Sequence, residues 1–113
     1  MDSLEPVANV TTEQGLRQCL AAGGQIEVTC RETPDRRGPS WYGIWTIQSI
    51  LPTGDRKHLI PARSNTPDGG FKLREFKTAT GLISFLVGCG FREVRFPFVP
   101  GETSALKLEE TAL

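Results

Sequence analysis

The apolar residues near the start of the chain recur with a helical period and then alternate with polar ones, which predicts a helix followed by a strand. The helix is expected to start at Thr11, whose spacing from Gln14 fits a capping box, and its apolar residues form one narrow stripe. Gly23 and Gly24 predict its end, because glycine readily adopts the left-handed conformation that closes a helix. Residues 25–31 then alternate between apolar and polar side chains, as in a half-buried strand.

The middle of the chain predicts strands separated by loops rich in proline and glycine. Residues 32–40 contain two prolines, a glycine and no large apolar side chain, so an exposed loop is expected there, with Arg36 and Arg37 at its tip. The next run is rich in aromatic and branched residues, which favours a central strand, and the turn residues at 52–55 predict a hairpin. The strands expected in this part of the chain are residues 41–51, 56–63 and 71–76.

A second helix–strand unit lies further along the chain and repeats the first. When the chain is shifted by 66 residues, seven of seventeen aligned positions are identical between residues 12–28 and 78–94. In both units a threonine precedes a short apolar helix, a glycine ends the helix, and an alternating strand follows. The second unit is expected to comprise a helix from Thr78 to about Gly88 and a strand over residues 92–98, at a sheet edge because Pro97 cannot donate a ladder hydrogen bond.

The second helix is apolar around most of its circumference. A helix of this kind is expected to be buried on all sides, whereas one face of a sheet covers only one side of it. Two interpretations stay open. The leucines of residues 102–113 fold over the helix, or the helix forms a homodimer interface through Leu82, Phe85 and Leu86.

These elements predict a single α+β domain of two layers. We expect a mostly antiparallel five-stranded sheet, in the element order αββββαβ, with both helices on one face. If residues 7–10 add a short first strand, each helix lies between two strands, and the arrangement approaches a ferredoxin-like split βαβ fold with an added hairpin. Residues 11–101 are expected to form the domain, residues 1–10 a flexible acidic segment, and residues 102–113 a flexible or weakly helical tail.

Length, charge and cysteine content narrow the class of protein. A chain of 113 residues can bury roughly two thirds of the surface that its unfolded form exposes. Thirteen basic and thirteen acidic residues leave it formally neutral, which argues against a histone-like or strongly acidic protein. The three cysteines have no paired spacing, and no signal peptide or long apolar span is recognisable. We therefore expect a reduced cytoplasmic protein without a membrane partner.

No residue pattern indicates a catalytic, metal or cofactor site. His58 is the single histidine and has no second histidine or cysteine pair near it in the sequence, so we expect a structural or surface role. The cysteines lack a nearby base that would activate a thiol. Glu27 and Glu93 are equivalent in the repeat, but solvated strand residues are commoner than paired catalytic carboxylates. We expect a non-enzymatic protein without a cofactor.

A basic surface is expected on the sheet face that the helices leave open. Lysine and arginine contact phosphates while an aromatic ring stacks on a base, so such a face suits single-stranded nucleic acid. An ordinary solvated sheet face also carries lysine and arginine, and this interpretation stays open as well. The residues assigned to nucleic-acid binding are Arg31, Arg36, Arg37, Tyr42, Lys57, Arg63, Lys72, Arg74 and Arg95.

Three hypotheses of function follow. The first is a small accessory protein that binds nucleic acid through the basic face, the second is a protein-interaction or oligomerisation module that assembles through the second helix, and the third is a small enzyme. The segment Phe76-Lys77-Thr78, the leucines after it and Gly90-Phe91-Arg92-Glu93-Val94 resemble the helix–strand units of small accessory proteins of bacterial plasmids and integrated elements. The resemblance implies a bacterial accessory protein and carries no residue role across.

Overall fold

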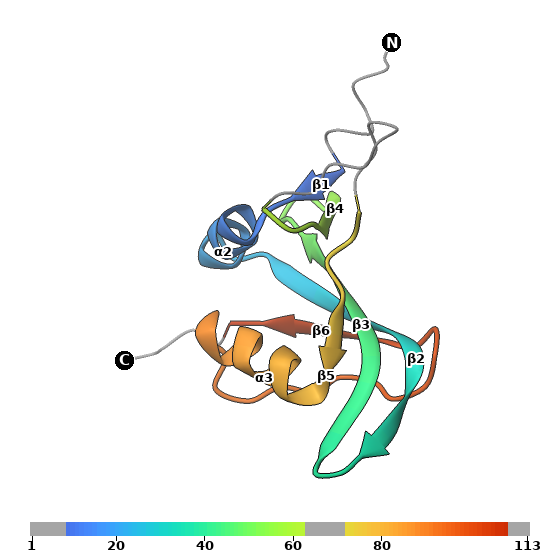
Figure 1. Ribbon diagram of the computed structural model, residues 1–113. Helices are drawn as coiled ribbons and strands as arrows, with labels where there is room; N and C mark the ends of the chain where they lie inside the picture. The colour runs from blue at the N-terminus through green and yellow to red at the C-terminus, as the bar shows by residue number, and fades with distance from the viewer. Residues whose placement is uncertain (1–8, 63–71, 109–113) are drawn as a thin grey trace.

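A computed structural model of the protein describes residues 9–62 and 72–108, which form an α+β domain with one mixed sheet (Figure 1). The element order βαββββαβ confirms the predicted architecture and includes the short first strand. The elements are β1 (Val10–Thr11), α2 (Glu13–Ala21), β2 (Gln25–Arg37), β3 (Ser40–Ile50), β4 (Arg56–Leu59), β5 (Phe76–Thr78), α3 (Ala79–Gly88) and β6 (Thr103–Lys107). Within the described ranges, no helix is long and apolar enough to cross a membrane.

The sheet has the strand order β1-β4-β3-β2-β6, and β5 pairs with β3. The β1–β4 pair is parallel and all other pairs are antiparallel, so the sheet is mixed. Helix α2 is flanked in the chain by β1 and β2. These two strands run parallel and are separated in the sheet by β4 and β3. Helix α3 is flanked by β5 and β6, which run antiparallel to each other. A ferredoxin-like fold needs two split βαβ units with parallel flanking strands, so it does not form here.

The strands β4 and β5 together occupy one position beside β3. The strand β4 pairs with β3 at Gln48, Ser49 and Ile50, whereas β5 pairs with β3 at Tyr42 and Trp45. Both strands are antiparallel to β3 and lie on the side away from β2 (Figure 1). The chain therefore leaves this position after β4 and returns to it with β5. The expected strands over residues 56–63 and 71–76 are correspondingly shorter, and residues 63–71 lie outside the described part.

Both helices begin and end where the repeat predicts. The side chains of Thr12 and Thr78 cap α2 and α3, accepting hydrogen bonds from the backbone N–H groups of Gly15 at 3.4 Å and Gly81 at 2.9 Å. Thr12 rather than Thr11 is the N-cap of α2. Gly90 follows α3 with a φ of 106°, a left-handed conformation that favours glycine and turns the chain out of the helix.

Two expectations for the second half of the chain are wrong. Residues 92–98 form no strand; they run irregularly past α3, because Val94 and Phe96 pack against the core and the free edge of β2 is taken by β6. The expected tail instead supplies β6, whose Leu106 is buried on the helix-covered face. Residues 109–113 of that tail, and residues 1–8 of the expected flexible start, lie outside the described part, while Val10 belongs to β1.

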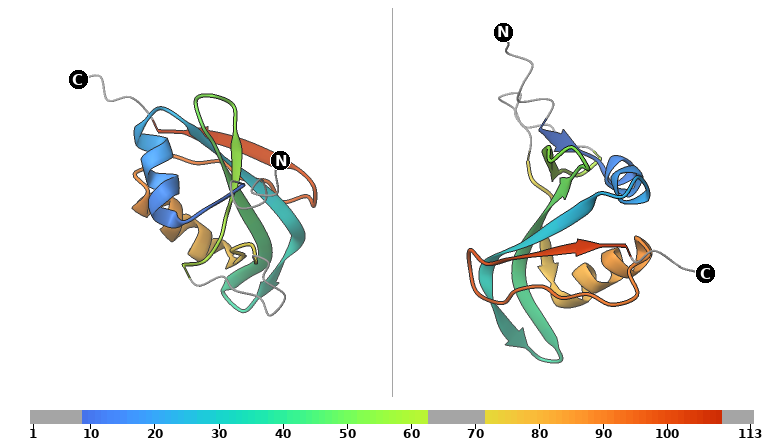
Figure 2. Two further views of the ribbon diagram at one scale, coloured as in Figure 1. Left: turned by 90° about the horizontal axis from the view of Figure 1, so that it is seen from above. Right: turned by 180° about the vertical axis from the view of Figure 1, so that it is seen from behind.

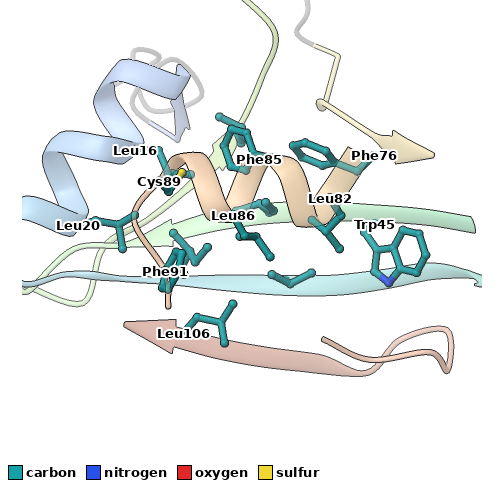
Figure 3. Packing of buried hydrophobic residues seen from close by; sticks show 14 of the residues in the cluster. Leu16, Leu20, Trp45, Phe76, Leu82, Phe85, Leu86, Cys89, Phe91 and Leu106 are labelled. Carbon is teal, nitrogen blue, oxygen red and sulfur yellow. The ribbon is translucent and has the colours of Figure 1, made fainter. Parts of the chain in front are cut away.

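The core lies between the sheet and the two helices, which cover the same sheet face (Figures 2 and 3). The face of α3 that meets the sheet is formed by Leu82, Phe85 and Leu86, all buried within the protomer. These three residues are therefore core residues and not a surface interface. The expectation that α3 is buried on all sides is wrong, since Ile83 and Val87 are 44% and 63% exposed.

Candidate functional site

The structure does not bring the residues assigned to nucleic-acid binding together on one face. Arg31 lies on the open face, where its Nε donates a 2.9 Å hydrogen bond to the Thr46 hydroxyl. Tyr42 is on the same face, and Arg37 at the hairpin tip stacks on its ring, 5.1 Å from the centroid. Arg36 and Arg37 do lie at the end of the β2–β3 hairpin, although the expected loop over residues 32–40 is mostly strand.

Other members of the set lie elsewhere. Lys57 lies on the helix-covered face rather than on the open face, because it pairs with Ser49, which in turn is opposite the buried Ile26. Lys72 and Arg95 lie in irregular segments, before β5 and after α3. Arg63 lies outside the described residues.

Arg74 is part of a structural network rather than of the open face. Its guanidinium lies over the rings of Phe76 and Phe85, at 4.9 and 4.8 Å from their centroids. It also donates a hydrogen bond of 3.2 Å to Glu13 of α2. The same carboxylate pairs with Arg17 at 2.9 Å, and Arg17 donates to the Gly88 carbonyl at the end of α3 at 2.6 Å. The network therefore ties both helices to the segment before β5, and the two arginines hold the pKa of Glu13 below its usual value.

A different site emerges at the far end of the β2–β3 hairpin. The strand β6 pairs with β2 at Gln25–Thr29, so residues 32–44 extend beyond it; we call this part the hairpin arm. Register shifts between Cys30, Glu32 and Asp35 mark bulges, which bend a strand. The arm projects past α3 (Figure 1).

A groove lies between the hairpin arm, α3 and the irregular segment after α3. It encloses about 530 Å³, within the range of known ligand pockets. Apolar side chains dominate its lining, and none of the residues that form it carries a charge. The lining consists of Thr33, Pro34, Trp41, Trp45, Ala79, Ile83, Phe96 and Phe98.

The inner wall of the groove is an aromatic row that extends from the core to the surface. Trp45 is fully buried (Figure 3), and its indole N–H donates a hydrogen bond of 2.9 Å to the Pro97 carbonyl. Phe96 stacks edge-on against Trp45 with 5.6 Å between ring centroids, and Phe98 does so against Phe96 at 5.7 Å. Gly43 leaves room for the indole, because a Cβ there would lie 3.0 Å from the ring.

The rim of the groove exposes three large apolar side chains. Trp41 is 49%, Ile83 44% and Phe98 60% exposed. Trp41 and Trp45 lie on the same face of β3, because the side chains of every second residue in a strand point to the same face. This shared face can be predicted from the sequence. That the hairpin, α3 and residues 96–98 meet at one surface cannot be predicted from it. The exposed apolar residues of α3 are the sequence feature that could have indicated the site.

The cysteines and the histidine contribute no reactive group to this groove. Cys19, Cys30 and Cys89 are free and buried, and burial raises the pKa of each thiol. The His58 ring contacts the Gln48 amide at 3.1 Å across the β3–β4 pair. Across residues 9–62 and 72–108, no three potential metal-ligating side chains gather.

Comparisons with models of protein families, with curated proteins and with solved structures found no match to this chain.

Proposed function

We propose that the protein is a protein-interaction module that binds an apolar segment of a partner protein in the groove. The observation that carries the proposal is the cluster of Trp41, Ile83 and Phe98, three partly exposed large apolar side chains around one concave, uncharged surface. Contiguous exposed apolar surface of this kind is typical of interaction sites. Tryptophan at the rim of a pocket is also among the residues that most often dominate binding energy.

The composition of the lining favours recognition of a partner segment through burial of its apolar surface and through its shape. None of its eight residues is ionisable, and the only polar side-chain groups among them are the Thr33 hydroxyl and the indole N–H groups of Trp41 and Trp45. Complete burial of a large apolar side chain contributes about 1.5–3 kcal/mol, and the rim residues are already about half buried. Because ordering a bound segment opposes this gain, we expect a transient rather than a permanent complex.

A neutral peptide with apolar anchors tests the site. The probe is acetyl-Ser-Leu-Trp-Leu-Ser-amide, titrated to millimolar concentration into the ¹⁵N-labelled protein. We expect saturable chemical-shift changes at the amides of Trp41, Ile83 and Phe98. Ile83→Asp should abolish them while the protein stays folded, because Ile83 is an exposed residue of the groove.

Two control variants separate the groove from the helix that carries it. Ser84→Asp introduces the same charge on the next residue of α3, which is exposed and outside the lining, and should bind the peptide as the wild type does. Phe85→Asp places a carboxylate in the core and should unfold the domain. Equal binding by the Ile83→Asp variant, or shifts that never saturate, would reject the groove as a binding site.

Nucleic-acid binding is a second candidate, supported by the outer face of the hairpin arm. There Arg37 stacks on Tyr42, and Lys77 lines the same shallow hollow as both residues. Glu32 and Asp35 in that hollow oppose an anionic ligand. Fluorescence anisotropy with a labelled oligothymidine tests the idea: binding should weaken steeply with salt and be reduced by Tyr42→Ala. Absence of binding at low salt would remove this candidate.

A further inference from the structure

The groove is bounded by an uncharged helix on one side and by a charged strand pair on the other. From Ala79 to Gly88, α3 contains no ionisable side chain. Residues 96–98, the part of the segment after α3 that borders the groove, carry no charge either, and the preceding Arg95 lines a separate hollow with Leu106. The nearby charges that remain are those of the hairpin arm, which carries two carboxylates and two arginines, namely Glu32, Asp35, Arg36 and Arg37.

The register of the arm separates these charges onto two faces. Residues directly opposite each other in an antiparallel pair share a face. Arg36 is opposite Trp41, so it lies on the groove face. Asp35 is opposite Tyr42 and Glu32 is opposite Ile44, which places both carboxylates on the outer face.

The remaining charge of the arm belongs to the outer face as well. Arg37 pairs with Asp35 at 3.3 Å and stacks on Tyr42, and these residues line the hollow on that side. The groove face of the arm thus carries one positive charge, at the end where Trp41 forms the rim.

Arg36 is held in a position to receive an anion. It is exposed, and its Nε donates a hydrogen bond of 3.0 Å to the Gly38 carbonyl in the turn. This bond leaves the two terminal amino groups of the guanidinium free of hydrogen-bond partners in the described part of the chain. A guanidinium oriented in this way can bind a carboxylate through two parallel hydrogen bonds.

We infer that the partner segment carries an acidic side chain next to its apolar anchor, and that Arg36 selects it. The inference rests on the proposed function, since it requires the groove to bind a peptide segment. Apolar contacts with Trp41, Ile83 and Phe98 supply most of the affinity, and the exposed guanidinium of Arg36 supplies discrimination. Exposed ion pairs contribute modestly, so the preference for an acidic over a neutral peptide should be about 2- to 5-fold.

Three peptides that differ only in their flanking residues test the inference. The neutral probe above is compared with acetyl-Asp-Leu-Trp-Leu-Asp-amide and acetyl-Lys-Leu-Trp-Leu-Lys-amide, at low and at physiological salt. We expect the acidic peptide to bind most tightly and the basic peptide most weakly. Salt should reduce the difference. Arg36→Gln should remove the preference and leave binding of the neutral peptide unchanged, whereas Arg31→Gln on the open face should alter neither.

The outcomes separate this inference from the proposed function. If the neutral peptide binds but the acidic and basic peptides bind equally, or if Arg36→Gln keeps the preference, the inference fails and the groove stands. If no peptide binds, the proposed function fails. A concentration-dependent dimer that Ile83→Asp dissociates would also overturn the inference, because the uncharged α3 of a second copy offers Arg36 no anion.

Discussion

The indole N–H of Trp45 donates its hydrogen bond to the carbonyl oxygen of Pro97 across the boundary between the sheet and the irregular segment after α3. Trp45 is fully buried on β3, whereas Pro97 lies between two phenylalanines that line the groove. The bond therefore fixes the segment that presents Phe96 and Phe98. Core stability and groove shape are linked through this one contact.

Replacing this indole should destabilise the domain. Trp45→Phe removes the donor, leaves the Pro97 carbonyl without its partner and opens space in the core, so we expect a loss of about 2–4 kcal/mol in the free energy of unfolding. Urea denaturation measures the loss. Trp41→Phe is the matched control, because Trp41 is half exposed, and should stay within about 0.5 kcal/mol of the wild type. Equal losses for the two variants would contradict this account.

The glycines at the end of α3 should respond oppositely to alanine. Gly90 has a φ of 106°, which an L side chain rarely adopts, so Gly90→Ala should cost about 1–2 kcal/mol. Gly88 is helical, and a Cβ there meets Arg17 only at an ordinary 3.5 Å. Gly88→Ala should therefore be neutral or stabilise by about 0.5 kcal/mol, since alanine favours the helix. Thermal unfolding distinguishes the signs, and a stabilising Gly90→Ala would refute the assignment of that turn.

The Glu13 network should make stability depend on pH in a defined direction. Hydrogen bonds from Arg17 and Arg74 lower the pKa of this carboxyl group. Because the pKa of Glu13 is lower in the folded than in the unfolded protein, its ionised carboxylate stabilises the fold at pH values above about 4, where glutamate is ionised in the unfolded chain. This contribution is lost as the pH falls through the lower pKa of the folded state. The carboxylate is 42% exposed, so the contribution at pH 7 should be about 0.5 kcal/mol or less.

The Glu13→Gln variant tests that direction. Its stability deficit relative to the wild type should be present at pH 7 and should shrink on acidification to pH 3. Glu93→Gln, an exposed change after α3, should show no deficit at either pH. A deficit for Glu13→Gln that grows on acidification would have the wrong sign.

The cysteines should be protected while the protein is folded. Burial raises the pKa of all three thiols, which lowers the thiolate fraction, and their low exposure restricts access. Titration with a thiol-reactive disulfide at pH 8 should therefore be more than about tenfold slower for the native protein than for the protein in guanidinium. Rapid reaction of even one thiol in the native state would show that its surroundings open.

Local features of the fold are predictable from the sequence because each depends on few neighbouring residues. The threonines at positions 12 and 78 and the glycine at position 90 specify helix ends through their own backbone and side-chain chemistry. The alternation in β2 and the aromatic residues of β3 likewise identify the central strand pair. Hydrophobic periodicity shows which side of α2 and of β2 is apolar and therefore buried. It does not distinguish the buried from the exposed side of α3, which is apolar around most of its circumference.

Features that depend on pairing between distant segments are not predictable in this way. The strand β6 is short, and its pairing with β2 is specified by the space beside Ile26 and Val28 rather than by its own composition. The face on which Lys57 lies depends on the register of β4, since a shift of one residue exchanges the two faces, and its pairing with Ser49 places it on the helix-covered face. The groove joins three segments far apart in the sequence, so its apolar residues resemble ordinary core positions until the fold brings them to one surface.

The long β2–β3 hairpin has a consequence for the order in which the protein folds. Its ten residue pairs are joined by a turn of two residues, so the hairpin forms with little loss of loop entropy. The strands β1 and β6 join the sheet from opposite ends of the described chain, so their pairing closes long loops and is expected to be slower. The hairpin is therefore expected to nucleate folding, and the groove is completed only when α3 and the segment after it dock. A partner that recognises the groove would thus distinguish a fully folded chain from a partly folded intermediate.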